Sequence, residues 1–157
     1  MNQQVDRQVA DVIGDYTGHA RTVLEYCMTV DRLVHEAKSP GFGVQNWGAL
    51  AELVAVDEFE RVGAFKEVMD WPAYTDFLTT WATSSTWRCS FRRLTEAADL
   101  IFLELEEHSA VGDFTSVVNS LSVYRFNDTG KITHIDLYLQ MELPDPELLK
   151  SFEGVDP

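Results

Sequence analysis

Residues 122–132 read SVYRFNDTGKI, and they carry the clearest local signal of how the chain folds. They lie in the part of the chain after Ser85, where the side-chain period changes from 3.6 to 2, as is typical of strands. Asn127-Asp128-Thr129-Gly130 supplies a tight turn, because Gly130 can adopt the positive φ that such turns require. The stretch therefore predicts two antiparallel strands joined by a hairpin.

The same period of two extends over the rest of the C-terminal half. Val111-Gly112-Asp113 provides a second turn signal between two further strand candidates. Together these signals predict an antiparallel meander of four strands, over residues 86–95, 99–109, 115–126 and 131–142.

The N-terminal half has a helical pattern instead. Apolar residues recur at spacings of three and four from about residue 5 to 36, which predicts one long helix. A short helix is expected over 47–55 and a short strand over 56–62. Asp70-Trp71-Pro72 begins a third helix, since the missing N–H of Pro72 costs nothing in a first turn. Helices before strands favour an α+β fold with the helices packed on one face of a curved sheet.

Composition limits the possible partners. The 157 residues, enough for one domain spanning 1–157, carry a formal net charge of −14, which repels phosphate backbones and anionic lipid. Nucleic acid and membranes are therefore not expected as partners, and a cytoplasmic location is expected. The two cysteines, Cys27 and Cys89, show no CxxC spacing, and reduced buried thiols are expected.

Three segments resemble a known superfamily. Tyr26-x-x-x-Val30-Asp31-Arg32, then NWGALAEL at 46–53, and finally the hairpin stretch 122–132 are similar to the nuclear transport factor 2-like superfamily. Its members include ketosteroid isomerases, scytalone dehydratase, limonene epoxide hydrolase and the SnoaL polyketide cyclases. The resemblance implies a single SnoaL-like domain in which a cone-shaped, curved antiparallel sheet carries about three N-terminal helices on its concave face. It also implies an apolar pocket and a homodimer or other homo-oligomer formed through the convex face.

Strand parity then predicts which side chains line that pocket. Alternate residues of a strand share one face, and Ile101 to Glu107 match the pocket-lining parity of the isomerases. Aliphatic walls with a few polar groups suit a small hydrophobic molecule, especially one that contains a ring. The predicted substrate-binding residues are Trp47, Ile101, Leu103, Leu105, Ser122, Tyr124, Leu137 and Leu139.

Three candidate catalytic residues lie on the first long helix. Tyr26 aligns with the tyrosine that donates a hydrogen bond to the substrate oxygen in the isomerases; the alternative is a core tyrosine. Asp31 matches the aspartate at this helix end in scytalone dehydratase, or it simply fixes the next turn. His35 is spaced to pair with Asp31, and a histidine oriented by a carboxylate is a usable general base.

Two glutamates complete the predicted catalytic set. Glu60 resembles the proton-shuttling acid of the isomerases, with Glu58 as a rival on the same parity. Glu107 corresponds to one acid of the epoxide hydrolases and is either a lone acid in the pocket or a residue at its rim. Leu105 and Leu137 occupy the positions of their arginine and second acid, so the resemblance does not extend to the epoxide hydrolase mechanism.

These residues predict an acid–base enzyme without metal or organic cofactor. The four histidines show no HxxxH or HxH spacing, and glycine-rich nucleotide-binding motifs are absent. The expected activity is that of a lyase, dehydratase or isomerase on a small hydrophobic, ring-bearing or aromatic substrate. A polyketide, a steroid-like molecule or a lignin-derived diaryl compound would fit. The alternative is a non-catalytic small-molecule-binding or oligomerisation domain of the same fold.

Overall fold

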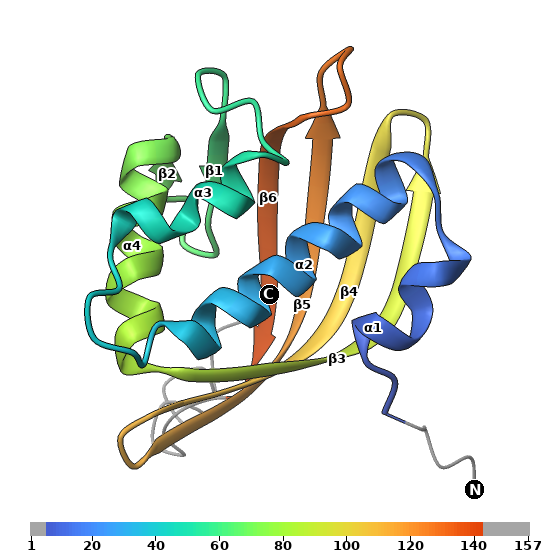
Figure 1. Ribbon diagram of the computed structural model, residues 1–157. Helices are drawn as coiled ribbons and strands as arrows, with labels where there is room; N and C mark the ends of the chain where they lie inside the picture. The colour runs from blue at the N-terminus through green and yellow to red at the C-terminus, as the bar shows by residue number, and fades with distance from the viewer. Residues whose placement is uncertain (1–5, 143–157) are drawn as a thin grey trace, which may run out of the picture.

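The computed structural model describes residues 6–142 (Figure 1). Four α-helices and two 3-10 turns come mainly before the long strands, in the order predicted. The helices are α1 (Val9–Val12), α2 (Gly18–Glu36), α3 (Gly48–Ala51) and α4 (Trp71–Ser84), with η1 at Ile13–Asp15 and η2 at Val44–Trp47. The strands are β1 (Glu60–Val62), β2 (Val68–Met69), β3 (Thr86–Ala97), β4 (Leu100–Val111), β5 (Phe114–Phe126) and β6 (Ile132–Met141).

The six strands form one sheet in the order β2-β1-β6-β5-β4-β3. The predicted meander is confirmed, since β3, β4, β5 and β6 pair antiparallel in sequence order. The sheet as a whole is mixed and not purely antiparallel, because β1 pairs parallel with β6, with Glu60 opposite His134. This pairing joins the helical half of the chain to the last strand.

The predicted packing of helices on one face of a curved sheet is also confirmed. Figure 1 shows α2 lying diagonally across the strands, with α3 and α4 on the same side near β1 and β2. We call this side of the sheet the helix-covered face and the other side the open face. The main core lies between α2 and the sheet, where Leu24, Leu50, Ile101 and Leu103 are buried.

The predicted single helix from residue 5 to 36 is wrong. The chain leaves the helix at Tyr16 and Thr17, which are extended, and Gly18 has a φ of +63°, which glycine adopts without steric cost. Arg7 pairs with Phe91 of β3, which holds the chain just before α1 at the edge of the sheet. The apolar spacing continued through the break because both helices pack against the same core.

Turns and caps follow the sequence signals more closely. Gly130 has a φ of +81°, and its N–H donates to the carbonyl of Asn127 at 3.0 Å, which closes the predicted hairpin. Asp70 caps α4, because its Oδ1 accepts from the N–H of Ala73 at 3.0 Å. The predicted strand over 56–62 is shorter than expected, since only Glu60–Val62 pair with β6.

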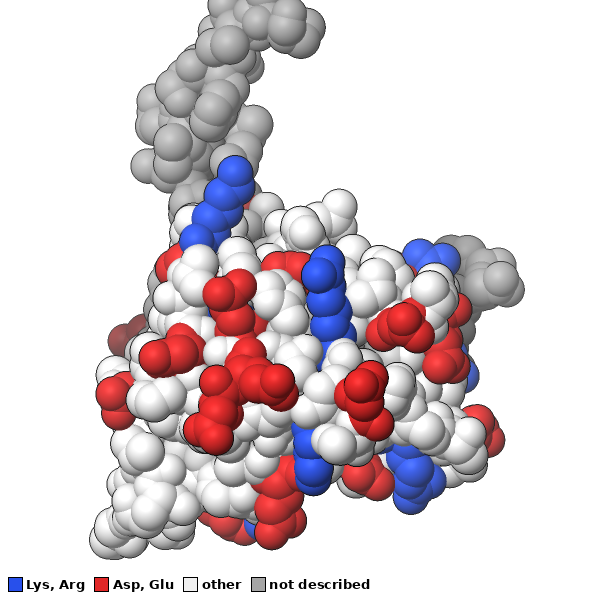
Figure 2. All heavy atoms as spheres, turned by 90° about the horizontal axis from the view of Figure 1, so that it is seen from above, with Lys and Arg blue, Asp and Glu red and all other residues white. Residues whose placement is uncertain are grey.

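The surface reflects the acidic composition. Figure 2 shows acidic side chains spread over the upper face of the molecule, with single basic side chains between them. None of the helices within residues 6–142 is both long enough and apolar enough to cross a bilayer.

Candidate active site

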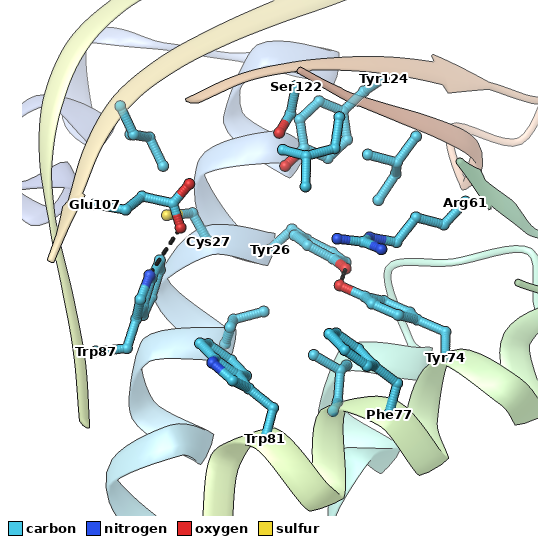
Figure 3. A pocket seen from close by; sticks show the side chains of 15 residues that line it. Tyr26, Cys27, Arg61, Tyr74, Phe77, Trp81, Trp87, Glu107, Ser122 and Tyr124 are labelled. Atoms are coloured by element: carbon cyan, nitrogen blue, oxygen red, sulfur yellow. Dashed lines mark hydrogen bonds between the residues drawn. The ribbon is translucent and has the colours of Figure 1, made fainter. Parts of the chain in front are cut away.

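A cavity of about 190 Å³ lies between α2, α4 and the helix-covered face of the sheet (Figure 3). Its wall is mostly aromatic and aliphatic, which is typical of a small-molecule site. The apolar lining residues are Val30, Phe77, Leu78, Trp81, Trp87, Leu105, Ile135 and Leu137. Polar atoms come from Tyr26, Cys27, Arg61, Tyr74, Glu107, Ser122 and Tyr124.

Glu107 is the only carboxylate among the described residues that line the cavity. It lies on β4, paired with Cys89 of β3 and Val118 of β5, and this register directs it to the helix-covered face. The indole N–H of Trp87 donates to Glu107 Oε1 at 2.8 Å. One carboxylate oxygen is thus oriented by Trp87, and Figure 3 shows the carboxylate directed into the cavity.

Tyr26 and Tyr74, which we call the tyrosine pair, contact each other through their hydroxyl groups at the wall of the cavity. The hydroxyl oxygens of Tyr26 on α2 and Tyr74 on α4 are 2.7 Å apart, and both side chains are buried. Burial raises the pKa of Tyr26 well above its ordinary value, and burial also raises the pKa of Tyr74. Both phenols therefore stay protonated. One hydroxyl donates to the other, which leaves the second proton available to a bound ligand.

Arg61 of β1 is the only cation among the described residues that line the cavity. Its guanidinium lies 5.0 Å from the ring centre of Tyr74 and 5.7 Å from that of Phe77. Its Nη1 is buried and has no hydrogen-bond partner within residues 6–142. The aromatic rings thus lie beside a cation that has one buried nitrogen, Nη1, without a hydrogen-bond acceptor among the described residues.

Comparison with known proteins supports the fold and not a reaction. No family model and no curated protein matches the sequence. Among solved structures, the chain is similar to an NTF2-like protein of unknown function from Exiguobacterium sp. 255-15, with 14% identity and a TM-score of 0.58 over 73% of this chain and 98% of that one. The chain has the nuclear transport factor 2-like fold.

Two further structures with this fold illustrate its range. One is an LEH-like epoxide hydrolase of M. tuberculosis, with 12% identity and a TM-score of 0.52 over 72% of this chain and 84% of that one. The other is a hypothetical protein with a ketosteroid isomerase-like fold from Catenulispora acidiphila, in complex with trimethylamine. It has 15% identity and a TM-score of 0.51 over 67% of this chain and 83% of that one.

The nuclear transport factor 2-like fold brings together six of the residues predicted from the sequence. The residues that line the cavity are Tyr26, Leu105, Glu107, Ser122, Tyr124 and Leu137. Ile101 and Leu103 share the parity of Leu105 but are buried in the core instead. Trp47 is also a core residue, and its indole N–H donates to Thr79 Oγ1 at 2.9 Å. Leu139 lines a separate hollow near Ser120.

The structure corrects the prediction for Asp31 and His35. Their side chains are 48% and 70% exposed, and His35 Nδ1 lies 3.5 Å from Asp31 Oδ1. The predicted pair therefore exists, but it lies outside the cavity. With about 3.6 residues per turn, these positions lie roughly 140° and 180° around α2 from Tyr26.

The prediction for Glu60 is corrected as well. Neighbouring residues of a strand point to opposite faces, and on β1 it is Arg61 that faces the cavity. Glu60 is 53% exposed, and its Oε1 lies 3.5 Å from His134 Nδ1 on β6. Its rival Glu58 accepts a hydrogen bond from Asn127 Nδ2 at 3.2 Å and does not line the cavity either.

Sequence reasoning missed the cationic and much of the aromatic part of the site. Tyr74 and Trp81 lie seven residues apart in the helix that begins after Asp70, a spacing that places both on one apolar face and is a usable signal for the wall of a pocket. Arg61 gave no such signal, because a strand of three residues does not fix its own parity.

The two cysteines are free, buried and close together. Their Sγ atoms are 3.8 Å apart, with Cys27 on α2 and Cys89 on β3. Hydrogen bonding to Cys89 and burial raise the pKa of Cys27 well above its ordinary value, so the thiol that lines the cavity stays protonated. Within residues 6–142, no three His, Cys, Asp or Glu side chains gather in a way that could hold a metal ion.

The open face of the sheet carries charged side chains that are paired with one another. Glu106 forms ion pairs with Arg92 and with His108, whose Nε2 lies 2.9 Å from Glu106 Oε1. Arg93 pairs with Glu104 in the same way. Hydrogen bonds from His108 and Arg92 lower the pKa of Glu106, and a hydrogen bond from Arg93 lowers that of Glu104.

Proposed function

We propose that the protein is an acid–base enzyme that moves a proton at a carbon next to a carbonyl group of a small, ring-bearing substrate. The observation that carries the proposal is the placement of Glu107. A single carboxylate faces an apolar cavity whose other side presents the hydroxyls of the tyrosine pair. Isomerisation and dehydration both use such a proton transfer, and neither needs a cofactor for it.

Glu107 is the proposed base. Trp87 holds Oε1, so Oε2 is oriented to take the proton from the substrate carbon. The electron pair of that C–H bond forms a C=C bond with the carbonyl carbon, and the π pair of the carbonyl group moves onto its oxygen, which gives an enolate. Glu107 then returns the proton to another carbon in an isomerisation, or to a leaving hydroxyl group in a dehydration.

The tyrosine pair is the proposed donor to the developing enolate oxygen. The hydroxyl that accepts from its partner keeps its own proton for the substrate, and the hydrogen bond between the two phenols polarises it. Because burial keeps both phenols neutral, they act as donors and not as bases. Donors positioned for a developing oxyanion are typically worth about 10²–10³-fold in rate.

The size of the cavity favours a substrate with a single ring. An engineered cavity of about 150 Å³ lined by apolar side chains holds one benzene molecule. The cavity of about 190 Å³ seen here matches one ring with a short polar substituent better than a steroid or a diaryl compound. Trp81 and Trp87, whose ring centres are 6.0 Å apart, provide aromatic surface for that ring.

Hydrogen–deuterium exchange tests the proposal directly. Phenylacetone and phenylpyruvate each carry acidic hydrogens between a phenyl ring and a carbonyl group, and their exchange in D₂O is followed by proton NMR. Wild-type protein is expected to accelerate the exchange of at least one of them. Glu107→Gln is expected to lower the enzymatic rate about 10²–10⁴-fold, because the amide cannot take the proton.

Glu60→Gln is the matched control, since it removes an acid of the same type outside the cavity. It is expected to keep the wild-type rate. Exchange at the wild-type rate in Glu107→Gln would show that Glu107 is not the base. Binding of both ketones without any exchange above the buffer rate would leave a binding domain as the better description.

A further inference from the structure

We infer that the substrate is an organic anion whose carboxylate binds Arg61, beside the carbonyl group that faces the tyrosine pair. This inference names the substrate class of the proposed acid–base site and rests on that proposal for its chemistry. The expected compounds are small 2-keto acids that carry one ring.

The hydrogen-bonding state of Arg61 is the first observation. The rings of Tyr74 and Phe77 lie near the guanidinium, at 5.0 and 5.7 Å from its central carbon. Arg61 takes part in none of the ion pairs found within residues 6–142, and its Nη1 is buried without a partner there. A buried, charged donor without a partner is costly, so its presence needs an explanation.

A carboxylate ligand supplies that explanation. The guanidinium presents parallel N–H bonds in one plane, which match the two oxygens of a carboxylate. A ketone oxygen alone would satisfy one N–H but would leave the positive charge uncompensated. The aromatic contacts of Arg61 hold the group in place before the ligand arrives, so little side-chain entropy is lost on binding.

The arrangement of polar groups in the cavity is the second observation. Figure 3 shows Arg61 beside the hydroxyls of Tyr26 and Tyr74, and Glu107 on the opposite side. A 2-keto acid fits this order, because its carboxylate and its carbonyl are adjacent. The carbon that loses the proton then lies on the side of Glu107, together with the ring.

The overall charge of the protein makes the inference easier to test. A net charge of −14 disfavours anions in general, so a preference for an anionic ligand must come from a specific cation. Arg61 is the only cationic side chain that lines the cavity among the described residues.

Phenylpyruvate and phenylacetone form a matched pair of probes. They share the ring, the methylene group and the ketone, and differ only in a carboxylate or a methyl group. Isothermal titration calorimetry at neutral pH is expected to give a Kd for phenylpyruvate about tenfold or more below that for phenylacetone. Arg61→Gln should remove this preference while the Kd for phenylacetone stays the same.

Two variants keep the test decisive. Arg125→Gln removes the same charge from an exposed position on β5, and it should keep the preference. Arg61→Lys retains the positive charge should Arg61→Gln fail to fold, and it should show a reduced preference, because an ammonium group cannot form the two parallel hydrogen bonds. Equal Kd values for the two probes in the wild type, or an unchanged preference in Arg61→Lys and Arg61→Gln, would overturn the inference.

Glu107→Gln separates this inference from the proposed function. The variant should lose exchange activity but keep or increase the preference for phenylpyruvate, because a negative charge is removed from the cavity. Loss of exchange in Glu107→Gln without any anion preference in the wild type would overturn the inference alone. An anion preference with unchanged exchange in Glu107→Gln would overturn the proposed catalytic role alone.

Discussion

The charged side chains on the two faces of the sheet have different kinds of partner. On the open face, Glu104 and Glu106 lie in ion pairs with arginine and histidine side chains. On the helix-covered face, Glu107 has a neutral indole as its hydrogen-bond partner, and Arg61 has aromatic rings beside it. Glu106 and Glu107 are neighbours on β4, so one step along a strand separates the two arrangements.

This difference indicates which charges serve the fold and which are available to a ligand. A carboxylate already bound to arginine has a lowered pKa and its oxygens are occupied, so it is a weak base. Glu107 takes part in none of the ion pairs among the described residues, and Trp87 occupies only one of its two oxygens, which leaves the other oxygen to a ligand. The comparison therefore supports Glu107, and not its more highly connected neighbours, as the catalytic acid or base.

After the loss of the Glu107 carboxylate, the largest expected effect comes from removing one hydroxyl on the helix-covered face. Tyr26→Phe is expected to lower the rate of hydrogen–deuterium exchange about 10²–10³-fold, because the enolate oxygen loses either its donor or the hydroxyl that polarises that donor. Circular dichroism should show an unchanged fold. Tyr138→Phe on the open face, where the side chain is 58% exposed, is the control and should keep the full rate. Equal rates for the two variants would remove the tyrosine pair from the mechanism.

A smaller effect, on stability and not on rate, is expected on the open face. Glu106→Gln breaks the pairs with Arg92 and His108 and is expected to lower the free energy of unfolding by up to about 1 kcal/mol at neutral pH. Because the folded-state pKa of Glu106 is lowered, its stabilisation is present above the pKa of an unfolded glutamate and is lost as the pH falls through the folded-state value.

Urea titrations at neutral and acidic pH measure this difference. The variant and the wild type should differ at neutral pH and converge in acid, while their exchange rates agree throughout. A difference that grows in acid would contradict the assignment of Glu106 as a structural ion-pair residue.

The smallest expected effect is a factor of two in mass. The homodimer implied by the resemblance stays a prediction, and the open face, with its half-buried charges and exposed Tyr138, is the surface proposed for it. Static light scattering at micromolar concentration should give twice the chain mass of 17.8 kDa. A mass of one chain would show that this face is simply solvated, and the contrast between the two faces would then be one of core and surface.

The sequence predicted the long strands well because their signals are local. The hairpin at Asn127–Gly130 and the alternation along β4 and β5 also fixed which side chains share a face, and so placed Glu107, Ser122 and Tyr124 correctly at the cavity. In a long strand, each further alternating residue supports the same assignment of side chains to the two faces of the sheet.

The helical half was harder to predict, for two physical reasons. A helix turns by about 100° per residue, so the five-residue step from Tyr26 to Asp31 leads to solvent although both residues match motif positions. The strand that carries Arg61 is too short to show its parity, and its parallel pairing with β6 depends on contacts distant in sequence. Tertiary structure decides such positions.

The hydrogen bond from Trp87 to Glu107 gives the unlabelled protein an optical signal of its own. Two of the four tryptophans, Trp81 and Trp87, line the cavity, whereas Trp47 and Trp71 are core residues. Indole emission responds to the charge and polarity beside the ring, so a ligand in the cavity, or a proton taken up by Glu107, changes the fluorescence of Trp87. The emission of Trp87→Phe is subtracted to isolate the signal of Trp87. The protonation state of the proposed base can then be followed by fluorescence before any substrate is known.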